Sequence, residues 1–135
     1  MSLPITALYA SILMIFALAL SIRAGGVRGK TGISVLFGEP PNMELAERVR
    51  VHQNFLEYVP LAIILMGIIE LNSGNTTFLH VFGVVLIFSR IAHAIGLKHD
   101  NMGHPGRVIG AGGTALISVA AALYALWMVV GPMLG

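Results

Sequence analysis

The 135-residue sequence contains no cysteine, and only 10% of its residues are charged, whereas 56% are hydrophobic. So little charge lies far outside the range of an ordinary soluble domain. The sequence also lacks a phosphate-binding glycine loop and a serine, histidine and carboxylate set around a nucleophile elbow. Without cysteine, a metal site would rest on His99 and His104 in "KHDNMGHPG", where we expect a solvated loop and no metal.

Four apolar stretches are each long enough to cross a bilayer, which takes roughly 20 mostly apolar residues. We expect helices over residues 3–22, 43–71, 77–97 and 108–130. The four stretches share no repeated motif, so the sequence predicts one domain over residues 1–135. The first stretch has no positively charged segment before it and reads as a retained helix, not a cleaved signal peptide. The predicted fold is therefore an all-α integral membrane bundle of four transmembrane helices.

Positive charge follows the first and third stretches, whereas the N-terminus, residues 72–76 and the C-terminus carry none. Lysine and arginine collect in cytoplasmic loops close to the spans. We therefore expect both termini outside and the polar face in the cytoplasm, which in a bacterium means the inner membrane. Such a face suits anionic lipid headgroups or an anionic small molecule.

The segment 47–60, "ERVRVHQNFLEYVP", begins the second helix with an unusual density of polar groups. Asn42 is a candidate N-cap. A helix from residue 43 to residue 71 would measure roughly 43 Å at 1.5 Å per residue, so its first turns would protrude from a core of roughly 30 Å. Arg50, Asn54 and Glu57 fall on one stripe of this helix, with Glu57 inside the membrane.

The third helix repeats this arrangement in "SRIAHAIG", where Arg90 and His93 lie one turn apart and Arg90 reaches a depth similar to that of Glu57. An ionisable side chain at this depth costs several kcal/mol unless it is paired or hydrated. One interpretation is a structural Glu57–Arg90 ion pair between the two helices. The surplus of donors at this end instead favours a water-accessible pocket for a carboxylate ligand, since arginine binds carboxylate bidentately. The polar groups are Arg23, Arg50, His52, Asn54, Glu57, Arg90, His93 and Arg107.

Two further patterns concern packing. Gly110, Thr114, Ser118 and Ala122 recur at intervals of four and predict a close approach between the fourth helix and a neighbour. Aromatic residues, among them Tyr9, gather toward the opposite membrane surface, where we expect them to act as interfacial anchors.

The segment 47–60, the segment "SRIAHAIG" and Arg107 together resemble the MAPEG family, the membrane-associated proteins of eicosanoid and glutathione metabolism. The resemblance covers nearly the whole chain. It implies a homotrimer of four-helix subunits, with glutathione held at each subunit boundary near the cytoplasmic surface. Arg107 matches the arginine that stabilises the thiolate. The positions that match glutathione contacts are Arg50, Asn54, Glu57, Tyr58, Arg90 and His93, with Arg23 and Gln53 supplied by the neighbouring subunit.

The resemblance predicts a glutathione transferase that acts in detoxification. Such an enzyme conjugates glutathione, its co-substrate, to lipophilic electrophiles from the bilayer, and it also reduces lipid hydroperoxides. The expected partners are further copies of the chain, glutathione, the electrophile and lipid, with no nucleic acid and no metal. Leu97 stands where many relatives carry a tyrosine, which favours the alternative of a non-catalytic membrane protein that binds glutathione or another acidic ligand, or of a purely structural oligomer. A transporter fits less well, because the ionisable groups do not continue through the membrane.

Overall fold

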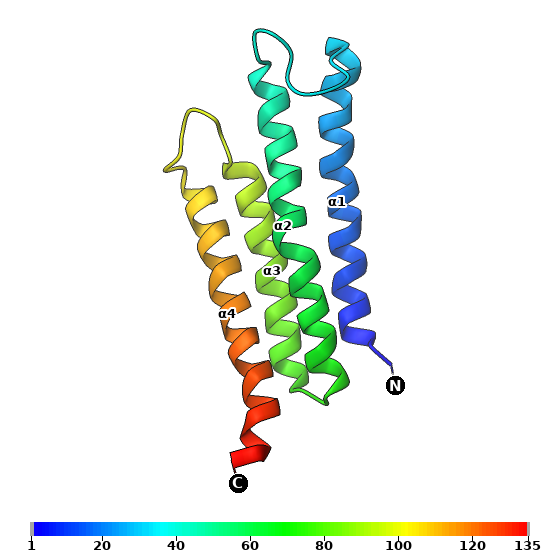
Figure 1. Cartoon of the computed structure of the whole chain (residues 1–135), viewed down its shortest axis with the longest axis vertical. Coiled ribbons are helices and arrows are strands. Elements are labelled where there is room, and N and C mark those ends of the chain that lie inside the picture. Colours follow the sequence, from blue (N-terminus) through cyan, green and yellow to red (C-terminus); the bar gives the residue numbers. More distant parts are fainter. Residues whose placement is uncertain (1, 135) are drawn as a thin grey trace.

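The computed structural model describes residues 2–134, which form four helices and no strand. They are α1 (Pro4–Thr31), α2 (Met43–Leu71), α3 (Thr76–Gly96) and α4 (Pro105–Leu134), and they lie side by side in one elongated bundle (Figure 1). All four are long and apolar enough to cross a membrane. The all-α fold with four membrane-spanning helices is thereby confirmed.

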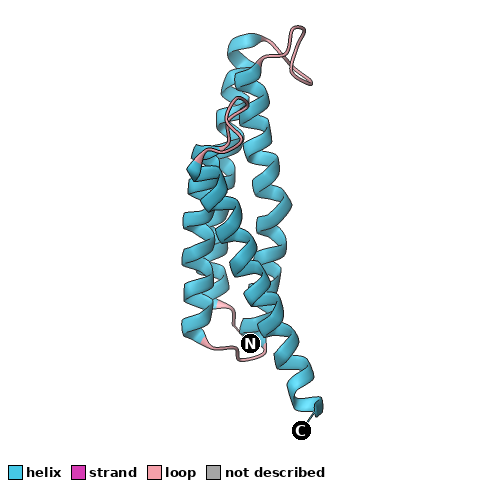
Figure 2. Ribbon diagram, turned by 90° about the vertical axis from the view of Figure 1, so that its left-hand side faces the viewer, coloured by secondary structure: helices cyan, strands magenta, loops and turns pink. Residues whose placement is uncertain are grey.

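The bundle is built from two helix pairs. α1 packs most extensively against α2, and α3 against α4, with smaller contacts between the pairs. Residues 32–42 and 97–104 connect helices at one end, called here the loop end. Both described termini and residues 72–75 lie at the opposite, terminal end, as Figures 1 and 2 show from two directions. The boundary between the two pairs, called here the seam, therefore lies beside two loops at the loop end and beside the termini and a short turn at the terminal end.

Local sequence explains where the helices begin. The side chain of Asn42 accepts a hydrogen bond from the N–H of Leu45 at 2.9 Å, which confirms it as the N-cap of α2. Asn75 does the same for α3 through the N–H of Phe78. α4 begins at Pro105, whose fixed φ suits a first helical turn and whose missing N–H leaves no unpaired donor there. The bounds of α2 are those that the sequence predicts.

α1 differs most from its predicted bounds, since it continues nine residues beyond Ile22 to Thr31. Charged residues and glycines begin at Arg23, but a helix that leaves the bilayer no longer needs apolar residues on every side. Ala24 and Val27 are buried in this extension, which packs it against the rest of the chain. The helix is capped by Gly32, whose φ of +70° is the left-handed conformation that favours glycine, and the N–H of Gly32 donates to the carbonyl of Arg28.

The core is apolar and lies mainly where α1, α2 and α3 meet. Its fully buried side chains include Leu13, Met66, Phe82 and Leu86. Large apolar side chains also face outward from every helix, as Ile15, Ile64, Phe88 and Leu116 do. An outward apolar surface of this kind is the expected lipid contact of a membrane bundle.

Candidate functional site

The site begins with a close crossing of α3 and α4 at the loop end. A Cβ placed on Gly96 would lie 2.1 Å from the backbone nitrogen of Arg107, and one on Gly110 would lie 2.4 Å from the backbone nitrogen of His93. Only glycine therefore allows the two backbones to approach so closely. Thr114 continues the buried face, whereas Ala122 is exposed and Ala121 is buried in its place, so the predicted small-residue stripe is correct only in its first half.

This crossing places Arg90 inside the bundle, with 3% of its surface exposed. The Nη1 of Arg90 donates to the Oδ1 of Asn54 at 2.9 Å, and its Nη2 donates to the carbonyl of Gly110 at 3.3 Å. Its Nε has no hydrogen-bond partner, and no carboxylate among the described residues pairs with the guanidinium. A buried cation with a free donor favours an anionic or strongly accepting ligand.

Glu57 instead pairs with Arg50 on its own helix. The two side chains form a bidentate contact, with Nη1 to Oε1 at 2.6 Å and Nη2 to Oε2 at 3.3 Å, and both are about half exposed. The interpretation of a direct Glu57–Arg90 ion pair is wrong. Asn54 lies between the two groups, because it donates to Glu57 at 3.4 Å and accepts from Arg90. An amide bridge therefore replaces the interhelical ion pair.

A cavity of about 280 Å³ lies in the seam between the helix pairs at the loop end. One wall belongs to α2, and the other belongs to the end of α3, the loop that follows it and the first turn of α4. Arg107 faces this cavity together with Arg50, although they come from opposite walls. The full lining is Ala46, Glu47, Arg50, Asn54, His93, Leu97, Lys98, His99 and Arg107.

A second cavity of about 220 Å³ adjoins the first, since Asn54 and His93 line both. It lies deeper, between α2 and α4, and also contains Arg90. Its outer edge is formed by the exposed residues Tyr58, Ala111 and Ala115. The guanidinium carbon of Arg90 lies 5.8 Å from the centre of the Tyr58 ring, which is within cation–π range. Together the two cavities connect a polar mouth with an apolar flank.

Three of the residues singled out in the sequence lie apart from these cavities. Arg23 on α1 and Gln53 on α2 are exposed, and within residues 2–134 neither lines one of these two cavities or forms a side-chain hydrogen bond. His52 is half-buried on a different side of α2 from Asn54. A single copy of the chain therefore brings together Arg50, Asn54, Arg90, His93 and Arg107, with Glu57 attached through Asn54.

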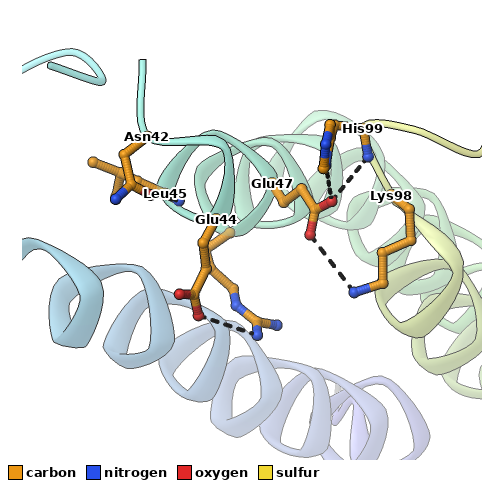
Figure 3. Close-up of polar contacts among 7 residues, drawn as sticks. Asn42, Glu44, Leu45, Glu47, Lys98 and His99 are labelled. Atoms are coloured by element: carbon orange, nitrogen blue, oxygen red, sulfur yellow. Dashed lines mark hydrogen bonds and ion pairs between the residues drawn. The ribbon is translucent and has the colours of Figure 1, made fainter. Parts of the chain in front are cut away.

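Three polar residues that line the mouth of the first cavity were not predicted from the sequence, namely Glu47, Lys98 and His99. Figure 3 shows Glu47 of α2 facing Lys98 and His99. Glu47 accepts from the N–H of His99 at 2.9 Å, lies 2.6 Å from the ring Nδ1 of His99 and lies 3.6 Å from the Nζ of Lys98. The available signal was spacing, because Glu47 precedes Arg50 and Asn54 by three and seven residues and so shares their face of α2.

Glu47, His99 and Asp100 also have ligand atoms within 4.8 Å of one another. Such a group has the chemistry to hold a cation. Lys98 opposes this use, because its ammonium group lies 3.6 Å from the same carboxylate and would repel a metal ion. The prediction of no metal therefore stays a prediction.

The terminal end carries a separate polar cluster. Glu70 accepts hydrogen bonds from the N–H groups of Ile5 and Thr6, at 2.9 and 2.7 Å, and so occupies the N-terminus of α1. Tyr9 is 5% exposed and its hydroxyl lies 3.0 Å from the Nδ1 of His80. Tyr9 is therefore a packed interhelical residue, and its interpretation as an interfacial anchor is wrong.

Comparisons with known proteins identify a family. The model of the MAPEG family matches residues 6–127. Inner membrane protein YecN of Escherichia coli K12 is 34% identical over 95 residues, which cover 70% of this chain and 71% of YecN, and YecN of Escherichia coli O6:H1 matches equally. No solved structure matches the chain significantly. With four membrane-spanning helices and a family match over most of its length, the chain belongs to the MAPEG family.

Proposed function

We propose that the protein is a membrane glutathione S-transferase, which binds the tripeptide in the cavity of the loop end and activates its thiol for attack on lipophilic electrophiles. The observation that carries the proposal is the convergence of Arg50 and Arg107 on one cavity that adjoins the buried, carboxylate-free Arg90. Two carboxylates and several amides make glutathione a suitable ligand for such a set of donors. Membership in the MAPEG family supports the same substrate.

The binding roles follow from the contacts of each side chain. Arg50 offers a glutathione carboxylate the N–H groups that Glu57 leaves free, and its contact with Glu57 holds the planar guanidinium in place. Arg90 and the amide of Asn54 line the deeper cavity and supply further donors there. Glu57 serves the ammonium group of the tripeptide, since it contacts both Arg50 and Asn54 and is half exposed. His93 and Tyr58 complete the lining.

Arg107 has the catalytic role in this proposal. A cysteine thiol has a pKa of about 8.5, so only a few per cent is thiolate at neutral pH, and the thiolate is the nucleophile. A permanently charged guanidinium near the sulfur stabilises the anion. A decrease of about two units in the thiol pKa corresponds to about 2.7 kcal/mol, which one partly desolvated guanidinium can supply.

The reaction balances without a metal or a redox cofactor. The thiol of glutathione releases its proton to solvent, the thiolate forms a C–S bond with the electrophilic carbon, and the leaving group departs with the electron pair of the bond that breaks. With a lipid hydroperoxide, two glutathione molecules become one disulfide while the hydroperoxide becomes an alcohol and water. The apolar edge of the second cavity, at Ala111 and Ala115, gives the acceptor a route from the bilayer.

The assembly and its location belong to the same proposal. The two exposed polar residues Arg23 and Gln53 would reach a glutathione bound to a neighbouring copy, as in a homotrimer. All lysines and arginines lie toward the loop end, at positions 23, 28, 30, 48, 50, 90, 98 and 107. By the preference of positive charge for the cytoplasm, the site faces the cytoplasm and both termini lie outside. The name of the Escherichia coli relative supports an inner membrane.

Ultraviolet absorbance of the thiolate tests the proposal directly. Purified protein with glutathione should show a thiolate signal, and it should conjugate glutathione to chlorodinitrobenzene. Arg107→Ala should abolish the thiolate signal while glutathione still binds, whereas Arg50→Ala should mainly weaken binding. Arg48→Ala is the matched control, because Arg48 pairs with Glu44 on its own helix and does not line the cavity. Equal thiolate signals in all four proteins would refute the assignment.

Leu97 favours a second candidate, a protein that binds glutathione or another acidic ligand without turnover. Leu97 lines the first cavity, is 9% exposed and offers no hydroxyl to the sulfur. Under this alternative, calorimetry would detect glutathione binding to the wild-type protein, but no thiolate signal and no conjugation would accompany it. Leu97→Tyr would then be expected to introduce a thiolate signal that the wild-type protein lacks.

A further inference from the structure

The first cavity lies between the two helix pairs, which contact each other less extensively than the two helices within each pair do. α1 and α2 form one pair and α3 and α4 form the other, so the walls that carry Arg50 and Arg107 belong to different pairs. The separation of these two guanidinium groups depends on the width of the seam. One ligand can contact both only if the seam is held at a fixed width.

Two sets of contacts cross the seam beside the cavity. At depth, Arg90 of α3 donates to Asn54 of α2. At the mouth, Glu47 of α2 contacts both Lys98 and His99 (Figure 3). Within residues 2–134, the side-chain hydrogen bonds and ion pairs of the loop 97–104 to α1 or α2 all go to Glu47. This one carboxylate therefore supplies the polar attachment of the loop to α2.

The geometry of Glu47 suits such an attachment. Its side chain is 12% exposed, so water competes little for its oxygens. One oxygen receives the backbone N–H and lies against the ring of His99, while the other faces Lys98. The backbone contact is important, because it fixes the path of the loop and not only the position of a flexible side chain.

The loop leads directly to Arg107. The N–H of Arg107 donates to the carbonyl of His104, the last residue of the loop, at 2.9 Å. On its other side, the backbone of Arg107 touches Gly96, which fixes its distance from α3. The glycine contact sets the position of Arg107 within its own helix pair. Nothing in that contact sets the distance of Arg107 from α2.

We propose that Glu47 is a positioning residue, which fastens the α3–α4 loop across the seam and thereby holds Arg107 at the distance from Arg50 that one bound glutathione requires. This inference rests on the proposed function, because it assigns a role in the activation of the thiol. Glu47 acts through the loop and not by contact with the sulfur. Loss of the fastening should therefore reduce thiolate formation more than binding.

Hydrogen exchange and kinetics on the purified full-length protein test this inference. In Glu47→Ala, the amides of residues 97–104 should exchange faster. The thiolate signal per bound glutathione and kcat with chlorodinitrobenzene should fall about tenfold, as expected for a misplaced catalytic group, while KM for glutathione changes less than about threefold. Glu47→Gln should be intermediate, because its amide oxygen still accepts from the N–H of His99.

Glu44→Ala is the matched control. Glu44 lies one turn earlier on α2, and its partner Arg48 belongs to the same helix, so this change removes a carboxylate without loosening the seam. It should leave loop exchange, thiolate signal and kcat at wild-type values. If Glu47→Ala does not fold, His99→Ala removes the ring contact, keeps the backbone contact and should shift the same quantities in the same direction.

Each contrary result would overturn a different step of the inference. An unchanged loop exchange in Glu47→Ala and His99→Ala would overturn the fastening, and a faster exchange with an unchanged thiolate signal would overturn the positioning role. An increase in KM alone would mean that Glu47 contacts the ligand itself, which also overturns the inference. If the wild-type protein shows no thiolate at all, the proposed function fails, and the role of Glu47 fails with it.

Discussion

Arg90 is the residue whose surroundings constrain the chemistry of the site most strongly. Its guanidinium is almost fully buried, and its two described acceptors are the neutral side chain of Asn54 and the carbonyl of Gly110. An arginine at membrane depth without a carboxylate partner is costly, unless water or a ligand also solvates it. Asn54 is consequently more than a proposed ligand contact, since it also connects Arg90 with Glu57.

Replacement of Asn54 by leucine tests this dual role. The change replaces the amide by an apolar group with the same branching and leaves Nη1 of Arg90 without its acceptor, which should cost about 1–3 kcal/mol of unfolding free energy. We expect the loss in unfolding by denaturing detergent in mixed micelles, together with weaker glutathione binding in calorimetry. Ser21→Ala is the control, because Ser21 is exposed on α1 and forms no hydrogen bond within the described chain. Equal stability of both variants would contradict the bridging role.

Single residues also show how far sequence could predict the site. The stripe of Arg50, Asn54 and Glu57 and the depth of Arg90 follow from helical geometry alone, so the gathering of polar groups at one end was predictable. The partner of Glu57 was not, because Arg50 has a side chain long enough to reach it across two turns, and its direction depends on the surroundings. The contacts of Glu47 depend on the path of a loop, which helical spacing does not determine.

At the scale of helices, the crossing of α3 and α4 controls where Arg90, His93 and Arg107 lie. Gly110→Ala should force the two backbones apart, since its Cβ would overlap the backbone of His93. Overpacking of this kind typically costs 1–3 kcal/mol, and the contact of Arg90 with the carbonyl of Gly110 should weaken as well. We expect lower stability and a reduced thiolate signal.

Gly112→Ala provides the control on the same helix. A Cβ at Gly112 meets nothing within 4 Å, and alanine favours a helix by up to about 1 kcal/mol over glycine. This variant should be as stable as the wild-type protein or more stable, with an unchanged thiolate signal. A comparable loss in both variants would mean that α4 tolerates no methyl group at all, and the crossing would then have no special role.

The bounds of the helices also show what could and could not be predicted from the sequence. α2 was predictable in full because Asn42 provides a cap and Leu71 ends an apolar run. The extension of α1 was not, since glycines and charges after Ile22 are typical of a loop. Burial of Ala24 and Val27 and the hydrogen bonds of Arg28 to the carbonyls of Ile33, Ser34 and Leu36 stabilise it instead. The burial comes from contacts with the rest of the chain, and the hydrogen bonds come from the loop that follows the helix, so neither is visible in helix propensity alone.

Over the whole molecule, polar and ionisable side chains gather in two clusters, one at each end of the bundle. The loop end gathers Arg50, Arg90 and Arg107 around open cavities, whereas the terminal end uses its ionisable groups to connect helices. Glu70 joins the N-terminus of α1 to the end of α2, and Tyr9 joins α1 to His80 of α3. The terminal cluster therefore holds the three helices together far from the proposed site.

Glu70→Ala tests whether the two ends act independently. The carboxylate accepts from two N–H groups in the first turn of α1, where negative charge also suits the helix dipole, so its loss should lower the unfolding free energy by about 1 kcal/mol. Amides of the first turn of α1 should exchange faster. Glutathione affinity and the thiolate signal of the folded protein should stay at wild-type values, because the cavities at the loop end keep all their contacts. Glu70→Gln should lose less stability, since one amide oxygen still accepts. A parallel fall in stability and in the thiolate signal would instead mean that packing at the terminal end sets the width of the seam along its whole length, and that the loop end does not hold its own geometry.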